Sequence, residues 1–196
     1  SGDLDEDAIN DLKAQGASID IWGVGTRLIT GWGQPALGGV YKLAAIEKGD
    51  PPGQLQPVLK ASDTAEKTTT PGVKQVYRFY DRQSGFALAD VVALVDEPIP
   101  PHGPFEIFDP VHTWKRKVLN DYRVRPLLEP LIVGGRRVVE LPSLDAIRDR
   151  VKRELGALWP AYRRLRPPKP YIVDLSGGLW ALKDRLLRAL STSPPA

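Results

Sequence analysis

Residues 16 to 30 read GASIDIWGVGTRLIT, and our interpretation of the fold starts from this stretch. The apolar run from Ile19 to Trp22 predicts a short strand, Gly23-Val24-Gly25-Thr26 predicts a tight turn, and Thr26 to Thr30 predicts a helix. Glycines let the backbone turn sharply, and the N-terminus of a helix directs N–H groups and its positive dipole end toward any anion there. The stretch therefore predicts a phosphate-binding loop or, more simply, a tight strand-to-helix turn.

The residues before this loop predict another helix. Asp3 and Glu6 are spaced as in a capping box, and apolar residues recur at helical spacing over residues 4 to 15 until Gly16. A helix followed by a strand and a second helix is an alternating α/β order, in which functional loops lie at the carboxyl ends of the strands. The glycine-containing turn is thus expected on the functional face.

The middle of the chain is richer in strand patterns. We expect strands over residues 40 to 46, 57 to 61, 74 to 80 and 86 to 94, with a hairpin loop at residues 81 to 85. Residues 97 to 110 are rich in proline and glycine, and we interpret them as a connector.

The last part of the chain predicts a hairpin and two helices. Strands over residues 124 to 131 and 137 to 141 flank Gly134-Gly135, and amphipathic helices cover residues 143 to 159 and 176 to 190. Ser143 and Ser176 are the expected N-caps.

Composition excludes several classes of site. The chain of 196 residues has no cysteine, which excludes disulfides, thiolate zinc sites and a cysteine nucleophile. No apolar run approaches the roughly 18 residues that span a bilayer, so we expect no membrane segment and a cytoplasmic protein. The chain also lacks methionine, including an initiator, so we expect a fragment or a processed chain.

Charge is distributed unevenly along the chain. Residues 1 to 110 carry 9 basic and 16 acidic side chains, a net of −7, whereas residues 111 to 196 carry 18 basic and 8 acidic ones, a net of +10. The basic half lacks the interleaved aromatic residues that bind single-stranded nucleic acids. We therefore expect a solvated basic surface, or one that docks on an acidic partner region, and no nucleic-acid partner.

No established metal or nucleophile motif is present. His102 lies in a proline-rich loop and His112 precedes Thr113, and we interpret both histidines as structural or surface residues. The acidic run at residues 3 to 7 lacks the glycine of a calcium loop and fits helix capping better, so we expect no metal site. No nucleophile elbow supports a serine triad.

Three lysines are the remaining candidates for binding chemistry. Lys42 follows the glycine-containing turn, and Lys60 and Lys67 bracket the sequence ASDTAE. Lysine ammonium groups bind phosphates as point charges, although each of these lysines alone would more simply be a solvated surface residue.

The combined pattern resembles the C-terminal half of nicotinate phosphoribosyltransferases. WGVGTRLIT, QPALGGVYKLAAIE, the spaced lysines of LKASDTAEKTTTPGVKQVYRFYD, DEPIPP, PSL and YRRLRPP carry this resemblance across nearly the whole chain. The fold that it implies is α/β: residues 1–48 as the last βα units of an irregular α/β barrel, residues 49–110 as a β-rich region, and residues 111–196 as a C-terminal α+β region.

The resemblance also implies a reaction and roles for particular residues. Family members condense nicotinate with phosphoribosyl pyrophosphate to nicotinate mononucleotide and pyrophosphate, coupled to ATP hydrolysis, in NAD salvage; Mg²⁺ and ATP are expected for the full enzyme, usually a homodimer. By this resemblance Gly2 and Asp3 would contact the ribose and phosphate, and the amides of Gly23, Gly25 and Thr26 would hold the 5′-phosphate. Lys42, Lys60 and Lys67 would bind pyrophosphate or ATP phosphates. Many relatives carry asparagine in the middle of Ser1-Gly2-Asp3.

The same resemblance indicates what this chain lacks. The phosphorylated histidine, the nicotinate-stacking aromatic residue and the arginines of the base pocket belong to the family's N-terminal half and have no counterpart here. We therefore expect the chain to be inactive alone and to need that missing half as its partner. A nicotinamide or quinolinate phosphoribosyltransferase, and a non-catalytic phosphate-binding or assembly module, remain as alternatives.

Overall fold

The computed structural model describes residues 2–36, 38–49, 53–112 and 114–192. The chain divides into two units: an N-terminal unit of Ser1–Tyr41 with Arg164–Pro168, and a sheet unit of Lys42–Arg163 with Lys169–Ala196. Each unit is described by itself below. The division into three regions expected from the sequence remains a prediction.

The N-terminal unit contains the helices α1 (Glu6–Ala14) and α2 (Thr26–Ile29). Asp5 caps α1, because its Oδ1 accepts a hydrogen bond of 2.9 Å from the backbone N–H of Ala8, and it also pairs with the side chain of Arg27. The predicted cap at Asp3 is thus wrong by two residues. Gly31 ends α2 with φ of +59°, a conformation that side chains with a β-carbon rarely adopt.

The strand predicted at Ile19 to Trp22 is wrong. These residues have no regular secondary structure, and the side chain of Ile21 is 88% exposed. A strand is stable only when its backbone groups pair with a neighbour, and no strand of the described part of the N-terminal unit offers one. The helix expected after the glycines is confirmed, since α2 begins at Thr26, whereas residues 23 to 25 are irregular and form no assigned turn.

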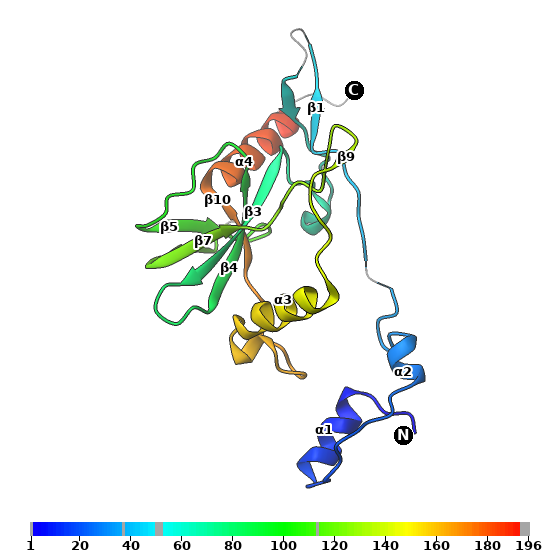
Figure 1. Ribbon diagram of the computed structural model, residues 1–196. Coiled ribbons are helices and arrows are strands. Elements are labelled where there is room, and N and C mark those ends of the chain that lie inside the picture. Colours follow the sequence, from blue (N-terminus) through cyan, green and yellow to red (C-terminus); the bar gives the residue numbers. More distant parts are fainter. Residues whose placement is uncertain (1, 37, 50–52, 113, 193–196) are drawn as a thin grey trace. The chain divides into compact units, whose positions relative to one another are not determined.

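The sheet unit is built on six strands (Figure 1). Their order across the sheet is β6 (Arg116–Leu119), β5 (Phe105–Phe108), β10 (Val173–Ser176), β4 (Ala87–Leu94), β3 (Lys74–Asp81) and β7 (Tyr122–Pro126). All neighbours are antiparallel except β4 and β10, which run parallel and pair Asp90 to Val173 through Val92 to Leu175. The parallel pair brings the last strand of the chain to the centre of the sheet.

Two further strand pairs and the helices complete this unit. The pairs are β1 (Ala45–Glu47) with β2 (Leu55–Pro57), and β8 (Ile132–Val133) with β9 (Arg136–Arg137). The helices are α3 (Leu144–Gly156) and α4 (Gly177–Thr192), with short 3₁₀ turns at Ala65–Lys67 and Pro160–Tyr162. The coarse expectation of a mixed α/β fold is confirmed.

Aromatic residues form the centre of the core. Phe79 is fully buried and packs against Phe105 and Tyr122, with ring centroids 5.2 and 4.7 Å apart. The Tyr122 hydroxyl donates a hydrogen bond of 2.9 Å to the carbonyl of Pro100, so this buried polar group has a partner. Alternate residues of β4 complete the packing; the fully buried ones are Ala87, Ala89, Val91 and Ala93.

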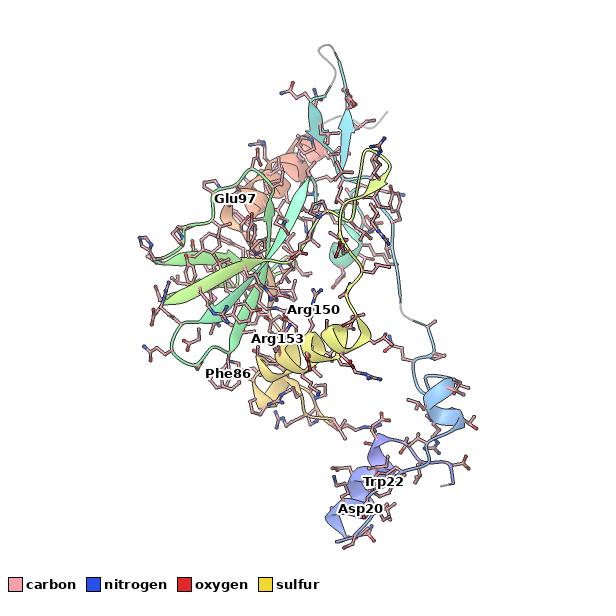
Figure 2. The ribbon with its side chains drawn as sticks, viewed as in Figure 1. Asp20, Trp22, Phe86, Glu97, Arg150 and Arg153 are labelled. Atoms are coloured by element: carbon pink, nitrogen blue, oxygen red, sulfur yellow. The ribbon has the colours of Figure 1, made fainter. Side chains whose placement is uncertain are left out.

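The N-terminus of α4 is closed by a carboxylate from the β4–β5 connection. Glu97 accepts hydrogen bonds of 2.5 Å from the Ser176 hydroxyl and 2.9 Å from the Gly178 N–H, and Figure 2 shows it beside the start of the helix. The negative charge is favourable at this positive end of the helix. A β-carbon at Gly178 would lie 2.7 Å from the Glu97 carboxylate, which explains the glycine there.

An ion-pair network joins α3 to the sheet. The Arg78 guanidinium donates to both oxygens of Asp90 at 2.7 and 2.8 Å and to Glu154 of α3 at 3.0 Å. The Tyr171 hydroxyl also donates to Asp90 at 3.0 Å, and Arg125 donates to Glu154 at 2.7 Å. Arg78 and Asp90 face each other across β3 and β4, so the register of the two strands aligns the pair.

Most predicted elements are present with altered bounds. Strands expected over residues 74 to 80 and 86 to 94 match β3 and β4 closely. Those expected over residues 40 to 46 and 124 to 131 overlap only partly with β1 and β7, and those over 57 to 61 and 137 to 141 share a single residue with β2 and β9, so their placement is largely wrong. The connector expected over residues 97 to 110 contains β5, so that interpretation is wrong in part. Ser143 caps α3 and Ser176 accepts from the Leu179 N–H at 3.3 Å, which confirms both predicted caps.

Removing the Asp90 carboxylate should destabilise the sheet unit strongly. Asp90→Ala would leave the largely buried Arg78 guanidinium without its bidentate partner, and we expect the free energy of unfolding to fall by about 3 kcal/mol. Asp149→Ala removes an exposed carboxylate of α3 that lies 4.0 Å from Lys152, and should change stability by less than about 0.5 kcal/mol. Urea denaturation measures both, and equal effects would contradict the role given to Asp90.

Candidate functional site

The glycine loop, residues 23 to 26, leads into α2 as its sequence predicts. Gly25 is the N-cap, and its carbonyl accepts hydrogen bonds from the N–H groups of Leu28 and Ile29 at 3.0 and 3.1 Å. Gly23, Gly25 and Thr26 are exposed, and a β-carbon at Gly25 would meet no atom within 4 Å. The loop therefore has open space beside its backbone, as binding of an anion would need.

A cavity of about 430 Å³ lies next to this loop within the N-terminal unit. Val24 is the residue of the glycine loop that lines it; the others are Asp5, Glu6, Ile9, Arg27, Leu28, Gly31, Trp32 and Gln34. Arg27 pairs with Asp5, and its guanidinium lies 5.5 Å from the centroid of the Trp32 ring. Sequence reasoning gave Arg27 no role, although a cation immediately after a glycine loop was an available signal.

Gly2 and Asp3 form a turn at the start of the described chain. Both have positive φ, +113° for Gly2 and +43° for Asp3, and aspartate is among the few residues that tolerate this conformation. Asp3 is exposed and has no ion-pair or hydrogen-bond partner among the described residues. Its carboxylate is therefore available to a ligand, and its role remains a prediction.

The three candidate lysines gather around one loop of the sheet unit. We call residues 60 to 69 the lysine loop: the Thr69 N–H donates to the Lys60 carbonyl at 3.1 Å and closes it. The Lys42 ammonium donates to the carbonyl of Lys67 in this loop. All three side chains are exposed, and none has a carboxylate partner within 4.0 Å in the part of the chain that the structure describes. The three neighbouring lysines are thus free of close ion pairs, although the loop itself has no net charge because it also carries Asp63 and Glu66.

The predicted site residues fall into two sets. Gly2, Asp3 and the glycine loop belong to the N-terminal unit, and Lys42, Lys60 and Lys67 belong to the sheet unit. The structure joins Lys42 to the loop that Lys60 and Lys67 bracket. That both sets form one phosphoribosyl site remains a prediction.

The histidines are surface residues, as expected. His102 is exposed, and His112 is half exposed with its Nδ1 3.5 Å from Asp109. Within the described ranges, no three histidine, cysteine, aspartate or glutamate residues lie together as metal ligands would. In those same ranges no helix has the length and apolar character needed to cross a membrane.

A second cavity, of about 570 Å³, lies beside β10 and contains two carboxylates with opposite pKa shifts. Burial raises the pKa of Asp174, and the charge of Asp109 raises it further, while Lys117 offsets part of this effect. Burial also acts to raise the pKa of Asp109, but N–H donors from His112 and Val111 and nearby positive charge outweigh it, so that pKa is lowered. Ionisation of Asp174 is thus less favourable in the folded protein than in the unfolded chain.

Comparisons with known proteins identify the family. The model of the nicotinate phosphoribosyltransferase C-terminal domain matches residues 73–183. The nicotinate phosphoribosyltransferase of Bacillus subtilis is 42% identical over 183 residues, which cover 93% of this chain and 37% of that protein. The human nicotinate phosphoribosyltransferase is 35% identical over 186 residues, which cover 95% of this chain and 33% of that protein.

A solved structure agrees with these sequence matches. The crystal structure of human nicotinic acid phosphoribosyltransferase aligns with a TM-score of 0.56 and 34% identity, over 61% of this chain and 24% of that one. The chain belongs to the nicotinate phosphoribosyltransferase family, and the family model places residues 73–183 in its C-terminal domain. It spans about a third of the length of the curated relatives that it matches.

The raised pKa of Asp174 predicts a pH-dependent effect of Asp174→Asn. Between the ordinary pKa of aspartate and the raised pKa in the folded state, the folded protein binds more protons, so wild-type stability falls as pH rises through the raised value. Asparagine stays neutral, and the variant should be more stable than wild type at pH 7, with the gain lost near pH 3. Urea denaturation at both pH values tests this, with Asp149→Asn as an exposed control; a gain independent of pH would contradict it.

Proposed function

We propose that this chain is the C-terminal part of a nicotinate phosphoribosyltransferase. The reaction joins nicotinate to phosphoribosyl pyrophosphate, releases nicotinate mononucleotide and pyrophosphate, and is coupled to ATP hydrolysis in NAD salvage. The main support is that the Bacillus subtilis and human relatives of this name align over 93% and 95% of the chain, so both the glycine loop and the lysine loop lie inside the aligned region.

The glycine loop would hold the 5′-phosphate of the substrate. The backbone amides of Gly23, Gly25 and Thr26 are the proposed donors, and the open space beside Gly25 supports this role. Gly2 and Asp3 would contact the ribose and phosphate. A ribose fixed at this end presents its anomeric carbon in one orientation, which lowers the entropic part of the barrier.

The lysine loop would stabilise the departing pyrophosphate. As the bond from the anomeric carbon to pyrophosphate breaks, positive charge develops on the ribose ring and negative charge on the leaving group, and the nicotinate nitrogen forms the new bond. None of Lys42, Lys60 and Lys67 has a carboxylate within 4.0 Å among the described residues, so their ammonium groups are available to the pyrophosphate or to ATP phosphates.

We assign no residue of this chain to Mg²⁺. The described residues hold no group of three candidate metal ligands, so we derive no step through the ion from this part of the protein. Mg²⁺ and ATP remain expectations for the longer enzyme, where an ion bound mainly by substrate phosphates needs few protein ligands.

We propose further that residues 1–48 complete an α/β barrel whose other strands lie in the N-terminal part of the enzyme, and that the enzyme is a cytoplasmic homodimer. Support for the barrel comes from large apolar side chains that the N-terminal unit leaves exposed, among them Ile21 at 88%, Ile29 at 87% and Val40 at 80%. The curated relatives are about three times longer than this chain, so the whole enzyme would have further chain with which to cover these side chains.

The chain alone should form no nicotinate mononucleotide. The base pocket and the phosphorylated histidine are expected in the N-terminal part, so activity should appear only when that part is expressed with this chain. Chromatographic detection of the nucleotide measures this. Product formation by the purified chain alone would refute the proposed division of the active site.

Substitutions in the two loops should weaken nucleotide binding by the assembled enzyme. Lys60→Ala removes a charged donor to phosphate, and Gly25→Val fills the space beside the glycine loop; we expect about a tenfold or greater loss of affinity for nicotinate mononucleotide or pyrophosphate in each case. Calorimetry measures the affinities. Lys48→Ala, at an exposed lysine outside both loops, is the matched control. If neither loop variant binds more weakly than this control, the site assignment is wrong.

A further inference from the structure

A buried lysine on α4 has no role in the proposed reaction. Lys183 is only 8% exposed, and its ammonium donates one hydrogen bond, of 3.1 Å, to the carbonyl of Pro110. No carboxylate lies within 4.0 Å of it among the described residues. An ammonium has three N–H donors and a full charge, so one carbonyl leaves it underpartnered.

Lys74 is a partly buried lysine of the same unit, and its ammonium has more hydrogen-bond acceptors than that of Lys183. The Lys74 ammonium donates to two carbonyls, those of Thr70 at 2.9 Å and Gly72 at 2.6 Å. Burial lowers the pKa of both lysines. Lys183 is the more deeply buried residue and yet has fewer acceptors, which points to a missing partner at its ammonium.

Lys183 lines a cavity of about 110 Å³ within the sheet unit. The walls are Thr68 of the lysine loop, Pro110 and Val111 after β5, and Trp180, Asp184 and Leu187 of α4. Most of these side chains are apolar. Asp184 pairs with Arg188 at 2.8 Å and therefore does not serve as the counter-ion of Lys183.

The ring of Trp180 forms part of the apolar wall of the same cavity. Its ring stacks on Phe108 with centroids 4.9 Å apart, and its buried Nε1 has no hydrogen-bond acceptor. The Lys183 ammonium and the mainly apolar walls define which ligand fits the cavity: one with an anionic head and an apolar body.

We propose that this cavity binds a small carboxylate with a flat apolar body. The carboxylate accepts from Lys183 and supplies the missing counter-charge, and the apolar body lies against Trp180, Val111 and Leu187. A free phosphate fits less well, because it carries more charge and no apolar surface to bury. The proposal does not depend on phosphoribosyl transfer, since it rests on residues to which that reaction assigns no role.

Nuclear magnetic resonance of the 196-residue chain with benzoate as the probe tests this site directly. The Trp180 indole N–H signal, assigned with Trp180→Phe, and the Lys183 Cε signal should shift saturably with one common dissociation constant. Benzyl alcohol has the same ring without the charge and should bind at least about tenfold more weakly. Inorganic phosphate should move neither signal. If benzoate leaves both signals in place, or binds no better than benzyl alcohol, the proposal is overturned.

Lys183→Met tests the ammonium itself. Methionine keeps most of the length and apolar volume of the side chain, and benzoate affinity should fall about tenfold or more. Lys152→Met, the same change at an exposed position of α3, should leave it unchanged. Full benzoate affinity in Lys183→Met overturns the proposal. Where that variant loses its folded spectrum, the wild-type titration with benzoate and benzyl alcohol decides.

Discussion

The bidentate pair between Arg78 and Asp90 is the interaction on which the arrangement of the sheet unit depends most. Asp90 lies on the central strand β4 and receives donors from Arg78 on β3 and from Tyr171 just before β10. Arg78 extends the network to Glu154 of α3. The network thus joins β3, β4, the segment before β10 and α3, and because each donor has a fixed geometry, it specifies register as well as stability. A shift of β3 by one residue would leave a nearly buried charge unpaired.

A second carboxylate organises the region where α4 begins. Glu97 bonds both the Ser176 hydroxyl and the Gly178 N–H, so the connection after β4 is tied to the helix that follows β10. Since β4 and β10 are the parallel pair, this contact joins the ends of two neighbouring strands. The Glu97 carboxylate also accepts from an N–H group at the N-terminus of α4, so this end of the helix already has an anionic partner within the protein. The open space beside Gly25 at the start of α2 holds no such partner among the described residues.

Local signals in the sequence predicted the caps at Ser143 and Ser176, the hairpin at Gly134-Gly135 and the strands β3 and β4, because each depends on neighbours within a few residues. They did not predict β5 or β10, which are only four residues long and gain their stability from partners distant in the sequence. The prediction at Ile19 to Trp22 failed for the complementary reason: the pattern is strand-like, but no strand among the described residues pairs with it. The sequence already placed Lys60 and Lys67 at the two ends of one loop, whereas the contact of Lys42 with that loop required the structure.

The two units differ in a way that bears on catalysis. Every buried residue in the described part of the chain belongs to the sheet unit, while the N-terminal unit has none and still carries the glycine loop. A loop that must hold a phosphate in one orientation needs rigid support, since a loosely held donor loses its advantage in the transition state. Such support has to come from packing that this unit does not make on its own. The sheet unit, by contrast, presents its lysine loop on a scaffold with a complete aromatic core. Assembly with the longer enzyme would thus matter more for the glycine loop than for the lysine loop, although both are assigned to one substrate.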